Sequence, residues 1–309
     1  MPDILAGMPA EVFLRNHWQQ QPLLIRAAMP AYAVPVTADE LAGLALQPEV
    51  ESRLIMERGE DGPWTLQLGP FDADHLSRLP PTHWTLLVQA LDLWVPEVRE
   101  LLTRFDFLPR WRIDDVMASF APEGGSVGPH FDQYDVFLLQ VEGRRRWQVG
   151  AQCGADDATV AGTPLNILAD FVATQEWVLE PGDMLYLPPR VAHWGVALED
   201  CMTFSVGFRA PSMADLLAEL AVDVATHPQL PHYRDPAMTL AMASETIDPA
   251  FIRQVQSQLM DLLADEALLA DWFARYMTQP KLPGYEDLTG ERRTARVAGR
   301  RYVNGELLD

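Results

Sequence analysis

Two histidines and one aspartate have the residue types and the spacing of a metal site. His130 and Asp132 stand two positions apart in the stretch GPHFDQYDVFLLQV. In a strand, residues i and i+2 point to the same face, so one imidazole and one carboxylate would project together. His193, which follows the turn at 181–183 in PGDMLYLPPRVAHWGV, is the expected third ligand. Two histidines and one carboxylate leave coordination positions open, as in non-haem Fe(II) oxygenases, whereas structural zinc sites use four ligands.

A plainer interpretation is that His130 and His193 are unrelated, because His-x-Asp often occurs by chance. Their surroundings favour a site. His130 follows the loop PEGGSVGP and enters an apolar run, and His193 follows a strand-turn-strand pattern. The remaining five histidines lack comparable neighbours: His17, His75, His83, His227 and His232.

An arginine-rich strand, RRRWQVG, comes directly after the first part of this motif. Its alternation places Arg145, Trp147 and Val149 on one face, and Arg144 and Arg146 on the other. The first face is the apolar one, so Arg145 should point inward. A buried guanidinium needs an anionic partner. The partner is either an internal Asp or Glu or a bound carboxylate, and we favour the bound carboxylate because a metal with open positions implies a cosubstrate.

The segment 111–208 must position these residues, and its pattern is β-rich. Short apolar runs alternate with the turn signals EGG, EG, PGD and ED. Many short strands at this spacing predict an antiparallel sandwich or small barrel. Before it, we expect a short helix from residue 10 that Pro22 stops, a strand at 23–25, a helix capped by Thr37, and a helix over 83–94.

The chain turns helical again after Arg209. Ser212 and Asp215 form a capping-box start, and Asp248 precedes Pro249 at the start of a helix that we expect over 250–277. An apolar stripe on that helix must bury against its own domain or against a second copy of the chain. Near the C-terminus, Asn304-Gly305 predicts a hairpin.

Composition excludes several classes of protein. The 309 residues are 48% hydrophobic, which is ordinary for a folded globular chain. No apolar run is long enough to cross a bilayer, and only two cysteines occur, which predicts a cytoplasmic location. The formal net charge of -21 would repel nucleic acid and attract a basic partner. The plainer interpretation is that the acidity only keeps the protein soluble.

Together these stretches, with the early FLRNHWQQQPLLIR, make the sequence resemble the JmjC-type ribosomal oxygenases. The resemblance covers about residues 10 to 208, and more loosely the helices. It implies a double-stranded β-helix of the cupin type, mainly β with α, that uses Fe(II), 2-oxoglutarate and O2. His130, Asp132 and His193 match the metal ligands, and Arg145 and Ser119 match the residues that hold the distal carboxylate of 2-oxoglutarate. The implied substrate is an arginine side chain of a basic large-subunit ribosomal protein.

The same resemblance implies an organisation in three parts. Residues 1–208 would form the oxygenase domain, and 209–278 a helical segment that makes a homodimer. Residues 279–309 would form a partial, winged-helix-like region, which is shorter than a complete winged helix.

Two residues directly after the metal motif are candidates for substrate binding. Tyr134 and Asp135 should leave the strand on opposite faces, so one of them could reach the cleft and meet a guanidinium. The alternative is that Tyr134 packs in the wall and Asp135 faces solvent. Two other functions are considered for the whole chain. One is a metal-binding cupin without oxygenase activity, which would not need an inward Arg145, and the other is an assembly protein that docks on ribosomal proteins through its acidic surface.

Overall fold

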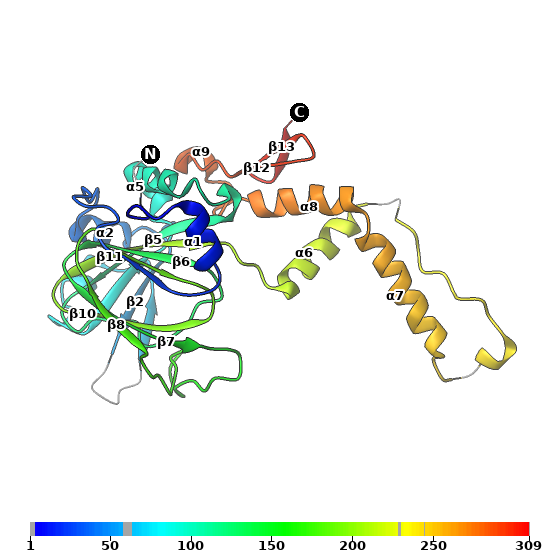
Figure 1. The fold of residues 1–309 in the computed structure, drawn as a ribbon, viewed down its shortest axis with the longest axis horizontal. Helices are drawn as coiled ribbons and strands as arrows, with labels where there is room; N and C mark the ends of the chain where they lie inside the picture. Colours follow the sequence, from blue (N-terminus) through cyan, green and yellow to red (C-terminus); the bar gives the residue numbers. More distant parts are fainter. Residues whose placement is uncertain (1–3, 58–63, 228–229, 244, 309) are drawn as a thin grey trace. The chain divides into compact units, whose positions relative to one another are not determined.

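The computed structural model describes residues 4–57, 64–227, 230–243 and 245–308. It divides into two compact units, 1–210 and 211–309 (Figure 1). Among the described residues, no helix combines the length and the apolar character that a membrane span requires.

Antiparallel strands build the first unit, as the sequence predicts. One sheet has eight strands in the order β1-β9-β6-β11-β5-β4-β2-β3, and a smaller sheet has the order β10-β7-β8. Residues of both sheets line one shared cavity, so the expected double-stranded β-helix architecture is present. The strands of this unit are β1 (Leu23–Ile25), β2 (Ser52–Met56), β3 (Thr65–Leu68), β4 (Trp84–Val88), β5 (Ile113–Ala121), β6 (Val136–Glu142), β7 (Arg145–Gln152), β8 (Gln175–Leu179), β9 (Met184–Leu187), β10 (Val191–Ala197) and β11 (Cys201–Phe208).

Strand β6 is apolar from Val136 to Leu139 because both of its faces are buried there. Phe137 and Leu139 pack into the main core, which lies between the large sheet and the helices. Val136 and Leu138 point the other way and pack between the two sheets. This alternation has the period of two that a strand imposes, and the neighbouring strands follow it.

Short helices cover the outer face of the large sheet (Figure 1). Thr37 caps one of them through a complete capping box with Glu40, which confirms the predicted start. The short helix from residue 10 is also confirmed, although it ends at Asn16, before Pro22 is reached. The helical elements of this unit are α1 (Ala10–Asn16), α2 (Ala38–Leu44), α3 (Ala73–Leu76), α4 (Leu91–Trp94), α5 (Pro96–Leu101), η1 (Leu102–Phe105) and η2 (Arg110–Arg112).

The predicted helix over 83–94 is wrong. Its first half is strand β4, which pairs with β2 on one side and β5 on the other, and only its last residues form the short helix α4. Residues 85–88 are all buried, a pattern that a central strand produces and a helix with one buried face does not. The apolar run was compatible with either element, and the pairing partners decided between them.

The turn between β6 and β7 sets the facing of the arginine strand. Gly143 has a φ of +60°, and a Cβ there would lie 2.1 Å from the carbonyl oxygen of Asp200, so only glycine fits. The turn brings Arg145, Trp147 and Val149 to the buried face of β7, which confirms the predicted alternation. In the small sheet β7 pairs with β10, and Val149 lies opposite His193.

The second unit is helical, followed by a small sheet. Capping by Ser212 and by Asp248 is confirmed. The expected continuous helix over 250–277 is divided, because the Asp265 side chain accepts hydrogen bonds from the backbone of Ala267 and Leu268 and starts a new helix. The helical elements here are α6 (Met213–Ala225), η3 (Leu240–Met242), α7 (Pro249–Leu263), α8 (Glu266–Thr278) and α9 (Glu286–Thr289).

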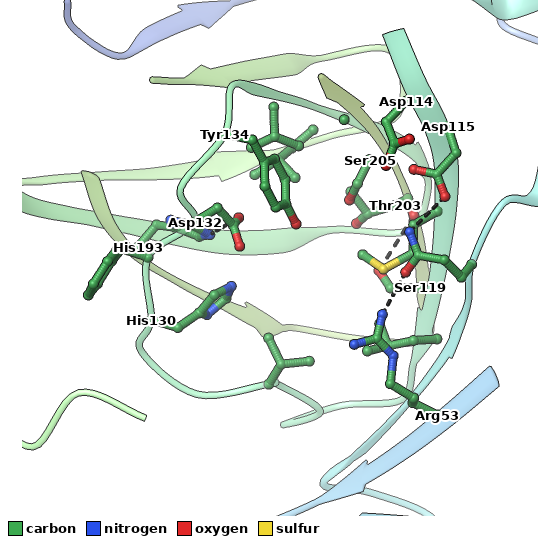
Figure 2. Close-up of a pocket in the computed structure, with 18 of the residues that line it drawn as sticks. Arg53, Asp114, Asp115, Ser119, His130, Asp132, Tyr134, His193, Thr203 and Ser205 are labelled. Carbon is green, nitrogen blue, oxygen red and sulfur yellow. Dashed lines mark hydrogen bonds and ion pairs between the residues drawn. The ribbon is translucent and has the colours of Figure 1, made fainter. Parts of the chain in front are cut away.

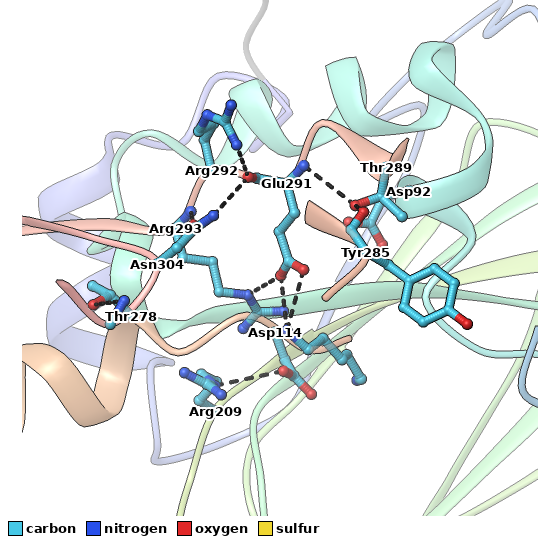
Figure 3. A network of polar contacts seen from close by, with 12 residues as sticks. Asp92, Asp114, Arg209, Thr278, Tyr285, Thr289, Glu291, Arg292, Arg293 and Asn304 are labelled. Atoms are coloured by element: carbon cyan, nitrogen blue, oxygen red, sulfur yellow. Dashed lines mark hydrogen bonds and ion pairs between the residues drawn. The ribbon is translucent and has the colours of Figure 1, made fainter. Parts of the chain in front are cut away.

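The C-terminal strands form a three-stranded antiparallel sheet that contacts α8: β12 (Thr294–Val297), β13 (Arg300–Val303) and β14 (Glu306–Leu308). Asn304 and Gly305 both have positive φ and close the predicted hairpin. The buried Glu291 ties this region together, because its carboxylate accepts from the backbone of Lys281 and from the Arg293 side chain (Figure 3).

Candidate functional site

His130, Asp132 and His193 converge in the first unit. One potential ligand atom from each lies within 4.8 Å of the others. The His193 Nε2 atom is 3.7 Å from Asp132 Oδ2, and the two imidazole centroids are 4.3 Å apart. Figure 2 shows the three side chains pointing toward one another on one side of the pocket. Across the described residues this is the cluster of His, Cys, Asp and Glu side chains whose geometry suits a metal ion.

Hydrogen bonds orient both imidazoles for ligation. The Nδ1 atom of His130 lies 2.9 Å from the carbonyl of Gly128, and that of His193 lies 2.9 Å from the carbonyl of Val191. A carbonyl only accepts, so each Nδ1 carries the proton and each Nε2 keeps its lone pair for a metal. Burial, and to a smaller extent the neighbouring His130, lowers the pKa of His193 to about 4. The ring is therefore neutral at physiological pH, as a ligand must be.

The prediction that His130 and Asp132 lie in a regular strand is wrong. Strand β6 begins only at Val136, and His130 makes an isolated bridge to His193. The two histidines exchange backbone hydrogen bonds of 3.0 and 2.8 Å, and the backbone N–H of Arg190 donates to Asp132 O over 2.6 Å. The metal motif is thus a loop fastened to the start of β10. The ligands meet through this bridge and not through the ladder of a strand.

Arg145 lies in the same pocket and is buried, with 4% of its surface exposed. Its Nη1 atom donates to Ser119 Oγ over 3.3 Å, but Nε and Nη2 are buried and have no hydrogen-bond partner within the described part of the chain. A buried guanidinium with two unused donors is costly unless an anion completes it. The internal carboxylate that was the alternative is not paired with Arg145, and a bound carboxylate fits the two donors.

The pocket has a volume of about 440 Å³. A further group of polar side chains lines the wall opposite the His-Asp-His cluster. Strand β5 contributes Asp115, and the adjacent β11 contributes Thr203 and Ser205. Asp115 is 3% exposed. Figure 2 shows Asp115, Ser205 and Thr203 across the pocket from the His-Asp-His cluster. The cavity therefore has a metal-ligating wall and an acidic, hydroxyl-bearing wall, with apolar side chains between them.

Tyr134 reaches this pocket and Asp135 does not. Tyr134 lines the cavity, and burial raises the pKa of its hydroxyl, with smaller contributions from Asp132 and Asp115. The phenol is therefore neutral, and its hydroxyl lies near the Asp132 carboxylate.

Asp135 needs a correction as a candidate substrate residue, and it does not face solvent either. It is fully buried, accepts from the hydroxyl of Tyr186 over 2.7 Å and from the Gln19 amide over 3.0 Å, and pairs with Arg112. Its charge is used to hold the N-terminal segment against the sheet, because a buried carboxylate must be compensated by donors.

Sequence reasoning missed Asp115, Ser205 and Thr203. A signal for them exists in the alternation of β5 and β11, where positions 203, 205 and 207 are small or polar between large apolar residues at 202, 204, 206 and 208. A fully buried strand with one polar face indicates a cavity on that face. Only the pairing of β5 with β11 shows that the two polar faces meet.

Comparison with known proteins agrees with this geometry. The model of a JmjC domain matches residues 100–216. A ribosomal protein uL16 3-hydroxylase of Escherichia coli is 36% identical, over 96% of this chain and 84% of the relative. A probable ribosomal oxygenase of Haemophilus influenzae is also 36% identical, over 97% of this chain and 72% of its own length.

Solved structures of the Escherichia coli protein YcfD have the same fold. One X-ray structure superposes with a TM-score of 0.88 at 35% identity, and covers 98% of this chain and 87% of that chain. Another, of YcfD with cobalt and 2-oxoglutarate, has a TM-score of 0.84 at 34% identity, and covers 98% of this chain and 86% of that chain.

We predict that the His130, Asp132 and His193 side chains bind about one divalent ion per chain. Replacing both imidazoles in a His130→Ala/His193→Ala variant should remove most of the bound metal, because a single carboxylate is left. Metal content after loading with Fe(II) or Co(II) and desalting measures this. His227→Ala/His232→Ala, which removes two exposed histidines of the other unit, is the matched control. Equal metal content in the two double variants would contradict the assignment.

Proposed function

This chain belongs to the JmjC-domain ribosomal oxygenases, and from that premise we propose that it is an Fe(II)- and 2-oxoglutarate-dependent hydroxylase of an arginine side chain in a large-subunit ribosomal protein. One observation carries the proposal. A cluster of two histidines and one aspartate shares its pocket with a buried arginine that has two unused donors. The relatives support the reaction and the cosubstrate. One relative is a uL16 3-hydroxylase, and a solved structure of YcfD contains cobalt and 2-oxoglutarate.

His130, Asp132 and His193 would hold the iron, and Arg145 with Ser119 would hold the distal carboxylate of 2-oxoglutarate. Bound iron, 2-oxoglutarate and O2 together supply the oxidation: one oxygen atom enters a C–H bond, and the other enters the succinate that is released with CO2. Ser119 can serve because its hydroxyl lies between Arg145 Nη1 at 3.3 Å and the carbonyl of Thr203 at 3.4 Å. Its O–H can turn from the Thr203 carbonyl to a carboxylate that binds beside it, while its oxygen still accepts from Arg145.

The remaining pocket residues orient the reactants and exclude water. Trp147, Val136 and Leu138 belong to the apolar cluster between the sheets and line the cavity. An apolar wall strengthens the ion pair of Arg145 with a carboxylate because it lowers the local dielectric. A plain metal-binding cupin would not need a buried, uncompensated guanidinium beside its metal, so this arrangement favours the oxygenase.

Asp115, Ser205 and Tyr134 would receive the substrate guanidinium at the far end of the pocket. The Asp115 carboxylate supplies the opposite charge, and the Ser205 hydroxyl can accept an N–H. The Tyr134 ring provides a face for the planar cation. The formal net charge of -21 attracts a basic protein and speeds its encounter with the enzyme, while direct binding of nucleic acid is disfavoured.

The proposal includes a homodimer built from the helices of the second unit. Helix α7 has no buried residue, and its stripe of Ile252, Val255, Leu259 and Leu263 stays exposed. A contiguous exposed apolar face of this kind is typical of a protein–protein interface. Residues 279–309 would extend the same unit as a shortened winged-helix-like region. A cytoplasmic location fits the two cysteines, Cys153 and Cys201, which are both free thiols.

Cosubstrate binding can be tested at Arg145. Arg145→Ala should raise the KM for 2-oxoglutarate by roughly one and a half to three and a half powers of ten, because losing one partner of a buried charge pair costs on the order of 2–5 kcal/mol. Succinate formation at varied 2-oxoglutarate measures the change. Arg144→Ala and Arg146→Ala are the controls on the opposite face of β7 and should change KM little. Equal effects of all three substitutions would refute the carboxylate role.

The substrate class can be tested with paired peptides. Basic ribosomal peptides that contain arginine should gain one oxygen in the presence of Fe(II) and 2-oxoglutarate, and matched lysine or histidine peptides should gain much less. Mass spectrometry detects the gain, and the His130→Ala/His193→Ala variant should abolish it. The KM for the peptide should rise with salt, because screening weakens the attraction. Preferred oxidation of lysine or histidine peptides would overturn the arginine assignment and leave the oxygenase chemistry intact.

The dimer can be tested on helix α7. Leu259→Asp places a charge in the apolar stripe and should shift the full chain from dimer to monomer at micromolar concentration, as measured by light scattering. Ser257→Asp adds the same charge at an exposed position on the opposite face of α7 and should leave the dimer intact. A parent chain that is already monomeric would contradict the proposal.

A further inference from the structure

A chain of side-chain hydrogen bonds leads from Arg53 to Asp115 along the pocket wall. Arg53 Nη2 donates to Gln89 Oε1 over 2.5 Å, and Gln89 Nε2 donates to Asp115 Oδ2 over 2.7 Å. The dashed lines between Arg53 and Asp115 in Figure 2 follow this path. All three residues line the cavity, yet neither Arg53 nor Gln89 belongs to the metal cluster or to the Arg145 side of the pocket.

Three adjacent strands position this series of hydrogen-bonded side chains. Arg53 is on β2, Gln89 directly follows β4, and Asp115 is on β5, and these strands are neighbours in the large sheet. The backbone of Gln89 is fixed as well, because its N–H donates to the carbonyl of Glu51 over 2.9 Å. The amide side chain therefore starts from a rigid point between the two charged groups.

The two hydrogen-bond partners of the Gln89 side chain, Arg53 and Asp115, require the same orientation of its amide. A guanidinium only donates hydrogen bonds, and a carboxylate only accepts them. The reverse orientation would point the amide oxygen at the Asp115 carboxylate and the amide NH2 at the Arg53 guanidinium. Arg53 thus fixes the amide, and the amide fixes one oxygen of the carboxylate.

A second donor completes the arrangement at Asp115. The backbone N–H of Ala90 reaches the same Oδ2 atom over 2.8 Å. Ala90 has φ +52° and ψ +41°, a left-handed conformation that costs free energy for a residue other than glycine. Such strain persists where the surroundings fix it, and it is often found at functional sites. With two donors on one oxygen, the plane of the Asp115 carboxylate is set.

We propose that Arg53 and Gln89 are positioning residues that hold the Asp115 carboxylate in the plane that a guanidinium requires, and that they thereby set the preference for arginine over lysine. This inference rests on the proposed function, in which Asp115 receives the substrate cation. A guanidinium is a planar fork with directed N–H groups, so its pairing depends on the orientation of the carboxylate. An ammonium is a compact charge with rotatable donors, and its pairing depends much less on that plane.

The test compares the parent protein with Gln89→Met, which keeps the length of the side chain and removes both hydrogen bonds. The KM for an arginine peptide should rise about 10- to 100-fold, as expected for the loss of a hydrogen bond to a charged group. The KM for a matched lysine peptide should change little, so the preference for arginine falls. The KM for 2-oxoglutarate should stay at the parent value, which also shows that the pocket is folded.

The control variant is Gln148→Met. Gln148 donates to Glu176 over 2.8 Å, so it makes the same kind of bond at a position that does not line the cavity. It should leave the arginine preference unchanged. An arginine preference that is equal in Gln89→Met and Gln148→Met overturns the positioning role.

Substitutions at Arg53 separate positioning from direct contact with the substrate. Arg53→Lys retains a donor for Gln89 Oε1 and should keep most of the arginine preference, whereas Arg53→Met should lose it. In the Gln89→Met background, Arg53→Met should add little, because Arg53 acts through the amide. Fully additive losses would mean that Arg53 contacts the substrate itself and would overturn the inference. If Gln89→Met alters the KM for 2-oxoglutarate, the positioning role is judged from Arg53→Lys and Arg53→Met instead. Equal preferences for arginine in these two variants would overturn the inference.

The parent protein keeps the two hypotheses apart. No oxygen gain on arginine peptides by the parent protein would refute the proposed function and this inference together. Oxygen gain by the parent with an unchanged arginine preference in the Gln89 and Arg53 variants would refute the inference alone.

Discussion

A reciprocal pair of backbone hydrogen bonds between His130 and His193 is the constraint on which the site depends. The two residues are distant in sequence, and the bridge between them is isolated, although His193 also pairs with Val149 of β7. The exchange of N–H and C=O fixes both Cα positions, and the carbonyls of Gly128 and Val191 then fix each ring. Asp132 is held by the backbone of Arg190, which lies just before β10. A metal added to this arrangement would meet ligands that are already oriented, so little reorganisation would oppose its binding.

The small sheet combines the two halves of the chemistry. Strand β10 carries His193, and its partner β7 carries Arg145 on the same buried face. The separation between a metal at the cluster and the guanidinium is therefore set by strand register, which is rigid. The length of a cosubstrate that could bind both the metal and the guanidinium would therefore be fixed by the sheet. The described residues provide no carboxylate for this guanidinium, which is unfavourable without a ligand, so a ligand that carries a carboxylate would be favoured there.

The large sheet supplies the other wall through its own alternation. On β5 and β11, large apolar side chains pack into the main core, and Asp115, Thr203 and Ser205 line the pocket. Asp135 uses a carboxylate in a different way, since it is enclosed by Tyr186, Gln19 and Arg112 and stabilises the fold. Two aspartates of similar burial thus have different surroundings: Asp115 lines the pocket, and Asp135 does not.

Much of the site was determined by the sequence, because the signals were local. The alternation at 145–149 predicts an inward Arg145 from a period of two, and the helix starts at Thr37, Ser212 and Asp248 follow from capping chemistry within one turn. The spacing of His130, Asp132 and His193 indicates a metal site before any contact is known.

Only the tertiary structure decided the strand at 84–88, the burial of Asp135 and the presence of Asp115 and Ser205 in one pocket. An apolar run is compatible with a helix or a central strand, and a polar side chain with a pocket or a buried network. The choice depends on which distant segments pair beside it. Those pairings are set by the packing of the whole sheet, whose free energy is not contained in any local stretch.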